Sequence, residues 1–227
     1  MSSLPELNSG GDDLKNLKEA NVLDEKNIRE EISETINRLY ERGLVSSLGG
    51  NVSYIFRDKK YVLITPTGLD KKNVEPSDIV KVDLDGQVIG NGVPSSETIV
   101  HLKIYGARGD VNAIVHAHPA TAVGLVSAGY VPKGVTPEFV VMIGELGVVE
   151  FTTPGEKTAK TLAKVLKDHN LVILKNHGAF SVGNSLMQAF SRIEILEEAS
   201  KMIFVAKDFG GMPEFNQKQI KILLINM

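Results

Sequence analysis

The sequence has 227 residues, of which 42% are hydrophobic and 23% charged, a composition typical of a globular protein and too apolar for a disordered chain. Its 25 lysines and arginines and 28 acidic residues give a formal net charge of −3 without a basic stripe, which argues against nucleic-acid binding. The absence of cysteine excludes disulfides, a thiol nucleophile and cysteine-bound zinc, and the reducing cytoplasm is the expected compartment.

The distribution of apolar residues predicts one domain that does not enter a membrane. No apolar run approaches the ~20 residues of a membrane-spanning helix, and the polar start of the chain leads us to expect no signal peptide. Residues 1–20 are rich in Ser, Gly, Asp and Lys and predict a mobile tail. No repeat or low-complexity linker interrupts residues 21–227, so these are expected to form a single α/β domain.

The first half of this domain predicts one helix followed by two pairs of strands. The helix is expected between Asp24, a suitable N-cap, and Gly43, a suitable stop. Its apolar positions repeat at helical spacing and are Ile28, Ile32, Ile36 and Leu39. Strands are expected over residues 52–56, 61–65, 79–83 and 87–89, the last two joined by a turn at Asp85-Gly86.

The second half predicts an alternation of helices and strands. The expected helices cover residues 95–108, 119–128, 156–169 and 185–208. The expected strands cover residues 111–116, 139–143, 171–175 and 179–182. The remaining residues to Met227 are interpreted as a tail with an apolar patch over residues 220–225.

Three histidines have a spacing that suits a metal site. His116 and His118 flank Ala117 in a predicted strand, where side chains two residues apart point to the same side. His177 follows the predicted strand at residues 171–175 and is a third candidate, and catalytic zinc commonly takes three protein ligands. The alternative is that His116 and His118 are structural histidines satisfied by hydrogen bonds, and that His177 is a turn residue before Gly178.

A second candidate site lies in Pro94-Ser95-Ser96-Glu97, directly before a predicted helix. One interpretation is that a serine caps the helix while Glu97 complements the helix dipole. The other is that Ser95 and Ser96 hold a phosphate while Glu97 reaches the metal or acts as a base. His101 shares a helix face with Glu97 and is interpreted as a supporting or structural residue, whereas His169 is interpreted as solvated.

Two turns could also hold an anion. Gly49-Gly50-Asn51 offers bare backbone N–H groups, and Thr65-Pro66-Thr67-Gly68 offers a hydroxyl and a glycine amide. Ordinary turn chemistry explains each of them equally well.

The order of these motifs along the chain resembles the class II aldolase/adducin family, with its L-fuculose-1-phosphate aldolases the nearest branch. The resemblance extends from about Ile28 to about Asp208. It rests on Gly50-Asn51-Val52-Ser53, Ile64-Thr65-Pro66-Thr67-Gly68, Ser95-Ser96-Glu97, His116-Ala117-His118 and Asn176-His177-Gly178. It implies a single α/β domain with a central, mostly antiparallel sheet flanked by helices, and a homotetramer with sites at subunit interfaces.

The resemblance also implies roles for individual residues. His116, His118 and His177 match the family's zinc (Zn2+) ligands, for which Mn2+ or Co2+ would also suit. Glu97 matches the acidic residue that holds the fourth metal position at rest and becomes the acid/base group when substrate binds. The residues implied around the substrate phosphate are Gly50, Asn51, Thr67, Gly68, Ser95 and Ser96.

The implied activity is that of a lyase of carbohydrate metabolism. It would reversibly cleave a ketose 1-phosphate such as L-fuculose 1-phosphate to dihydroxyacetone phosphate and an aldehyde such as L-lactaldehyde. The implied partners are the small sugar phosphate and further copies of the chain, with no nucleic acid and no membrane. The alternatives are a sugar-phosphate epimerase or dehydratase with the same metal site, and a non-catalytic scaffold like adducin.

Two tyrosines of the family's aldolases are absent from this sequence. Val140-Val141 precede Met142-Ile143 where those aldolases have a tyrosine given by the neighbouring subunit, and no tyrosine follows Tyr130. Glu138 could act as a substitute proton donor or be an ordinary loop carboxylate.

Overall fold

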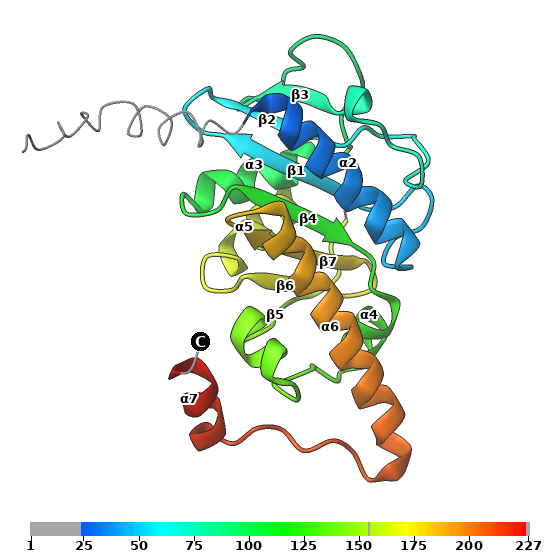
Figure 1. The fold of residues 1–227 in the computed structure, drawn as a ribbon, viewed down its shortest axis with the longest axis vertical. Coiled ribbons are helices and arrows are strands. Elements are labelled where there is room, and N and C mark those ends of the chain that lie inside the picture. Colours follow the sequence, from blue (N-terminus) through cyan, green and yellow to red (C-terminus); the bar gives the residue numbers. More distant parts are fainter. Residues whose placement is uncertain (1–23, 154, 226–227) are drawn as a thin grey trace, which may run out of the picture.

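A seven-stranded sheet with helices on both faces forms the core of the protein (Figure 1). The computed structural model describes residues 24–153 and 155–225, so the predicted tail at residues 1–20 lies outside the described residues. No helix in the described part of the chain is long and apolar enough to cross a membrane.

The sheet is antiparallel except between its last two strands, as the family resemblance implied. Its order is β3-β2-β1-β4-β7-β6-β5, and only β5 and β6 run parallel. The strands are β1 (Asn51–Phe56), β2 (Tyr61–Ile64), β3 (Val80–Asp83), β4 (Ala113–Ala117), β5 (Gly147–Val149), β6 (Leu171–Leu174) and β7 (Gly178–Gly183).

Two helical layers cover the two faces of the sheet. The helices are α2 (Glu25–Glu41), α3 (Thr98–Ala107), α4 (Ala120–Ser127), α5 (Glu156–Val165), α6 (Leu186–Ala206) and α7 (Gln217–Ile225). Apolar side chains of α2, α4 and α6 share one buried cluster with one sheet face, and those of α3 and α5 share a second cluster with the other. Burying both faces explains why most strands are apolar at nearly every position.

Several predicted elements have the expected type with shifted ends. Asp24 caps α2 by accepting a hydrogen bond from the backbone N–H of Lys26, and Gly43 follows the helix at a positive φ of 67°. Helix α3 begins at Thr98 rather than residue 95, because the Ser95 carbonyl already accepts the Thr98 N–H and hydroxyl. Helix α5 ends at Val165 rather than residue 169.

The predicted strand at residues 139–143 is wrong. Phe139–Ile143 forms a short π-helical turn, η2, closed by a hydrogen bond from the Gly144 N–H to the Phe139 carbonyl. Phe139 and Ile143 are buried at helical spacing in the cluster shared with α6, so tertiary packing overrides the β propensity of this apolar run.

Three further differences concern short segments. Residues 87–89 bond back to β3 through a single bridge between Val82 and Val88 and form no strand, since Gly90 and Gly92 interrupt the extended chain at positive φ. The predicted C-terminal tail contains α7 over its apolar patch. Strand β5 was not predicted, because its three residues are too few for a periodic pattern.

Candidate active site

The candidate site lies where three adjacent strands have their ends. Strand β1 begins at Asn51, which pairs with His116 near the end of β4, and β7 begins just after His177. Because β1 and β7 are both antiparallel to β4, their first residues lie beside the last residues of β4, along the edge of the sheet that is formed by these strand ends. The start of α3 brings Glu97 to the same place.

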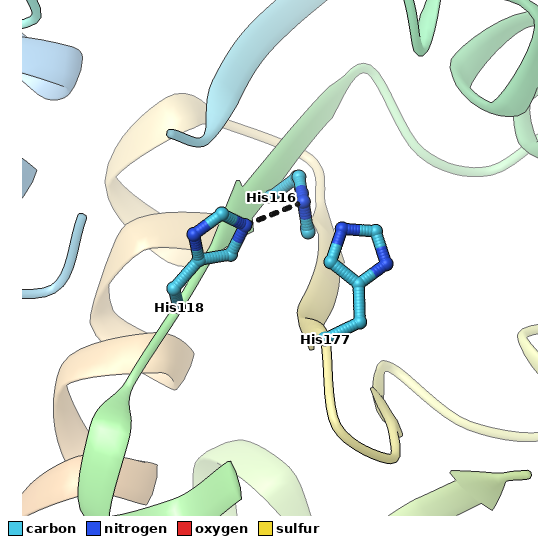
Figure 2. A group of neighbouring side chains, drawn as sticks. All are labelled: His116, His118 and His177. Carbon is cyan, nitrogen blue, oxygen red and sulfur yellow. Dashed lines mark hydrogen bonds between the residues drawn. The ribbon is translucent and has the colours of Figure 1, made fainter. Parts of the chain in front are cut away.

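The three candidate metal ligands converge at this edge (Figure 2). Ligand nitrogens of His116, His118 and His177 all lie within 4.8 Å of one another. The Nε2 atoms of His116 and His118 are 3.1 Å apart. Ala117 packs into the apolar cluster on the other face of the sheet, as the alternation of a strand predicts.

The surroundings of His118 and His177 favour neutral rings. Burial lowers the pKa of His118 to about 4, with His116 and His177 adding to the effect and Glu97 opposing it. Burial and His116 also lower the pKa of His177. The Nδ1 of His116 lies 3.0 Å from the Ala179 carbonyl, which can only accept, so Nδ1 carries a proton and Nε2 is the atom that faces the site.

Phe180 holds the central histidine ring in place. Its ring stacks on that of His116 with centroids 4.0 Å apart and an interplanar angle of 12°. His116 is fully buried, so its ring has little freedom to turn. The orientation of this ligand is therefore set by a carbonyl on one side and an aromatic face on the other.

This donor set fits a divalent metal ion. A tetrahedral zinc with bonds of about 2.0–2.1 Å holds two nitrogens roughly 3.3 Å apart, close to the spacing of His116 and His118. Two facing Nε2 lone pairs repel each other unless a cation or proton lies between them. Three neutral imidazoles and one carboxylate are ligands that Zn2+ commonly takes in catalytic sites.

Glu97 completes the group. Its Oε2 lies 3.1 Å from His116 Nε2, and its Oε1 lies 3.7 Å from His177 Nε2. Burial raises the pKa of Glu97, but His116, the hydrogen bond from the Asn51 amide and His177 together hold that pKa well below its usual range. The carboxylate is therefore ionised and within reach of a metal held by the histidines.

A chain of buried polar side chains stands behind Glu97. The Asn51 Nδ2 donates to Glu97 Oε2 at 2.7 Å, and the Asn51 Oδ1 lies 2.6 Å from His101 Nε2. On its other side, His101 Nδ1 lies 2.6 Å from the Ser53 hydroxyl, which lies 2.8 Å from the Tyr105 hydroxyl. Burial lowers the pKa of His101 to about 3, so this ring is neutral and has a supporting position, as the sequence suggested.

A cavity opens beside the histidines and has hydroxyl groups in its wall. Its volume is about 270 Å³, far larger than the ~30 Å³ of a water molecule, so a small organic substrate can enter. The predicted site residues that line it are Gly50, Asn51, Thr67, Ser95, Ser96, Glu97, His118 and His177. Gly68 does not line it; with a φ of 74° it serves the turn after Thr67.

Two glycines are required by the close packing of this edge. A Cβ on Gly50 would lie 2.4 Å from Val45 Cγ1, and its φ of 73° also favours glycine. A Cβ on Gly178 would lie 2.5 Å from the Ala117 carbonyl oxygen and 2.6 Å from His118 Cδ2. Gly178 thus lets the loop that carries His177 approach the other two histidines.

The structure also corrects and extends the predicted set. Lys71 and Thr158 line the cavity but were not predicted, because nothing in their local sequence separates them from solvated loop and helix residues. Glu138 is exposed and does not line the cavity of the single chain. His169 is half-buried rather than solvated, with Nδ1 3.0 Å from the Val165 carbonyl.

A family model, curated relatives and a solved structure all relate this chain to the same family of proteins. A family model described as the class II aldolase and adducin N-terminal domain matches residues 30–204. An L-fuculose phosphate aldolase of Methanocaldococcus jannaschii is 39% identical over 166 residues, covering 73% of this chain and 89% of that protein. A 3-oxo-tetronate 4-phosphate decarboxylase of Escherichia coli is 32% identical over 190 residues, covering 81% and 89%. A solved structure of an L-fuculose 1-phosphate aldolase has a TM-score of 0.80 at 30% identity, covering 88% and 95%.

Proposed function

Since the chain belongs to the class II aldolase and adducin family, we propose that it is a zinc-dependent aldolase acting on a ketose 1-phosphate such as L-fuculose 1-phosphate. The products would be dihydroxyacetone phosphate and an aldehyde such as L-lactaldehyde. The observation that carries this proposal is the convergence of His116, His118, His177 and Glu97 beside an open cavity with hydroxyls in its wall. A scaffold protein has no need of such a group.

The histidines would hold the metal without reducing its charge. A divalent ion on three neutral imidazoles supplies a Lewis acid that stabilises negative charge on a substrate carbonyl oxygen. The low pKa of His118, at about 4, keeps this ligand neutral near pH 7. Cleavage of the C3–C4 bond of the ketose leaves its electron pair in an enediolate, which is the charge that needs stabilisation.

Glu97 would move the proton in this reaction: as a carboxylate it would take the proton lost from the C4 hydroxyl, and it would return that proton to C3 of the enediolate. Contacts with His116 and Asn51 keep the pKa of Glu97 low while the carboxylate occupies the metal site. Substrate entering this position displaces the carboxylate from those contacts, which moves its pKa back toward a range suited to proton transfer. General acid-base catalysis of this kind contributes about 10²–10⁴-fold in rate.

The hydroxyl groups in the cavity wall would orient the substrate. Thr67, Ser95 and Ser96 carry these hydroxyls, and Gly50 contributes backbone. Holding the phosphate on these groups would fix the bond to be broken beside the metal, and such positioning can supply several kcal/mol of the barrier, on the order of the effects known for oriented reactants.

Decarboxylation is a second candidate, supported by the relative named 3-oxo-tetronate 4-phosphate decarboxylase and by the lining of the cavity. Loss of CO2 from a 3-oxo acid leaves the electron pair in the same type of enediolate, and protonation of that carbon again yields dihydroxyacetone phosphate. Unlike aldol cleavage, this reaction needs no base for a substrate hydroxyl. None of the described tyrosines lines the cavity of the single chain.

Association into a homotetramer is part of the proposal. Several apolar side chains near the end of α6 are exposed, among them Phe204 at 61% and Phe209 at 85%. Exposed apolar surface of this kind favours contact with another protein surface. Light scattering on the purified protein would give the oligomer size directly.

The decisive experiment compares co-products. The zinc-loaded protein is given L-fuculose 1-phosphate or 3-oxo-tetronate 4-phosphate, and dihydroxyacetone phosphate, aldehyde and CO2 are measured, with a chelator-treated control. Aldehyde release that the chelator abolishes and zinc restores supports the aldolase; CO2 release supports the decarboxylase.

If neither substrate is consumed, epimerisation of ribulose 5-phosphate and dehydration of methylthioribulose 1-phosphate are tested next. If the protein binds no metal, the result supports the alternative of a non-catalytic scaffold like adducin.

A further inference from the structure

A buried lysine forms part of the cavity wall. Lys71 is only 2% exposed, whereas its neighbour Lys72 is exposed. The ammonium group of Lys71 donates one hydrogen bond, of 2.9 Å, to the Pro66 carbonyl. An ammonium has three N–H donors, and no carboxylate of the described residues lies within 4.0 Å of this one. Burying a charge with so little compensation is unfavourable, so a further partner is expected for this ammonium group.

The backbone places the acceptor of this ammonium between two segments that carry hydroxyls of the cavity wall. Pro66, its acceptor, forms a bridge with Pro94, the residue before Ser95. The Ser95 N–H donates to the Thr65 carbonyl at 3.1 Å, which ties the two segments together. Thr67 and Ser95 therefore flank the acceptor of Lys71, and all three residues line the cavity.

The charge balance of the cavity points to an anion as the missing partner. A phosphate monoester carries a charge of about −1.5 to −2 near pH 7, and Glu97 in the same cavity is also negative. Hydroxyls and amides bind a phosphate without neutralising it. Among the described residues that line the cavity, Lys71 is the sole lysine or arginine.

We propose that Lys71 binds the substrate phosphate directly, as the cationic partner that the described residues of this chain supply, and makes the site selective for phosphorylated substrates. This inference rests on the proposed function for the identity of the substrate. The binding of phosphate by Lys71 does not depend on that function. The flexible four-carbon stem lets the ammonium keep its bond to Pro66 while its other N–H groups donate to phosphate oxygens.

A purely structural role for Lys71 makes a different prediction about stability. If its bond to Pro66 served only to close the loop, replacing it would lower the melting temperature. If the charge is kept for a ligand, the Lys71→Met protein should melt at the same temperature as wild type or higher, since removing an uncompensated buried charge is often neutral or stabilising.

The test measures binding of inorganic phosphate to the zinc-loaded, full-length protein by ³¹P NMR titration. Wild type is compared with Lys71→Met and with the matched exposed variant Lys72→Met. A charge-assisted hydrogen bond of ordinary strength predicts that Lys71→Met weakens phosphate binding by about tenfold to hundredfold. Lys72→Met should stay within about twofold of wild type, because an exposed charge is screened. Lys71→Arg should retain part of the affinity.

Unchanged phosphate affinity in Lys71→Met, or no saturable phosphate binding by wild type, would overturn the inference. If the Met variant does not fold, Lys71→Gln, which retains an amide donor for the Pro66 carbonyl, is used for the same comparison. The two proposals fail separately: a protein that turns over no sugar phosphate but needs Lys71 for phosphate binding contradicts the proposed reaction alone. If the protein is an active aldolase but wild type and Lys71→Met bind phosphate equally well, only the present inference is contradicted.

Discussion

His101 lies with its Nε2 2.6 Å from the Asn51 side-chain oxygen, and this contact decides which end of the Asn51 amide faces the candidate metal site. The carboxylate of Glu97 can only accept, so the Asn51 amino group must point toward it. The oxygen then points to His101, whose Nε2 donates and whose Nδ1 accepts from the Ser53 hydroxyl. A neutral, fully buried ring with this tautomer satisfies both neighbours.

Replacing His101 by Phe should impair turnover while leaving the metal in place. The change removes the donor to the Asn51 oxygen, so the amide that donates to Glu97 is no longer held in position from its other side. Mutating residues that orient the groups of a metal site typically costs about 10–100-fold in activity or metal affinity, and we expect this loss in kcat/KM. Metal content by elemental analysis and steady-state kinetics are measured together.

Tyr105→Phe is the matched control for His101→Phe. It removes the hydroxyl at the end of the hydrogen-bonded row that starts at Glu97, 2.8 Å from the Ser53 oxygen. The Ser53 hydroxyl can still donate to His101. We expect a stability loss of about 1 kcal/mol and near wild-type kcat/KM. Equal activity losses in both variants would mean that general destabilisation, not the Asn51 orientation, is responsible.

Replacing Glu97 by Gln should separate metal binding from proton transfer. The amide keeps a carbonyl oxygen for the Asn51 donor but cannot carry a proton, so kcat should fall by about 10²–10⁴-fold. Three histidines remain, and the variant should retain metal. Turnover close to that of wild type would exclude Glu97 as the acid/base group.

Removing His118 should abolish both bound metal and activity. The His118→Ala protein loses one of three candidate ligands, and its rate should fall to that of chelator-treated wild type. His169→Ala serves as the control, because His169 bonds to the Val165 carbonyl away from the site. Full metal content and full rate in the His118 variant would show that the ligands are misassigned.

Gly178→Ala should weaken metal binding through packing alone. The added methyl group would lie 2.6 Å from His118 Cδ2 and 2.9 Å from His116 Cε1, so the rings must move apart. A helical glycine with open space around its missing Cβ, Gly106, provides the contrast, and Gly106→Ala should stabilise the protein by about 0.5–1 kcal/mol. Titration with Zn2+ against a competing chelator measures the effect; identical zinc affinity in the two variants would contradict it.

Glu25 should stabilise the fold in a pH-dependent way. Burial raises its pKa, but hydrogen bonds from Lys81, Tyr61 and Arg29 outweigh burial and hold the pKa at about 2 instead of 4.5. Because the folded state has the lower pKa, this stabilisation is complete above pH 4.5 and is lost as pH falls toward 2. Glu25→Gln should therefore unfold more easily at pH 7 by roughly 1–2 kcal/mol, allowing for partial exposure.

Denaturant titrations of wild type and Glu25→Gln at several pH values check this prediction. The two stabilities should approach each other between pH 4.5 and 2, the window of the pKa shift. A difference that stays constant over that window would show that the charge of Glu25 contributes nothing and that only packing was lost.

Local sequence patterns were sufficient for the parts of the fold that depend on neighbouring residues. The repeat of Ile28, Ile32 and Ile36 gave the position of α2, because helical spacing places these side chains on one buried face. Alternation around Ala117 placed His116 and His118 on the same side of β4 for the equivalent reason. The motif order also identified the family, which the comparisons confirm.

The tertiary structure alone decided which distant residues meet and what a short apolar run becomes. Phe139–Ile143 is a π-helical turn rather than a strand because it packs against the layer of α6, information that lies outside the run itself. Lys71 resembles an ordinary solvated lysine in sequence, and the sequence placed His101 on the helix face of Glu97 without giving its contact with Asn51. Their burial beside Pro66 and Asn51 follows from strand register and from the path of the loops, which bring together atoms far apart in the chain. By itself, the sequence determined the types of the longer helices and strands and the pair of histidines on β4, since these depend on spacing. The electrostatic surroundings of the site depend on long-range contacts, which only the folded chain makes.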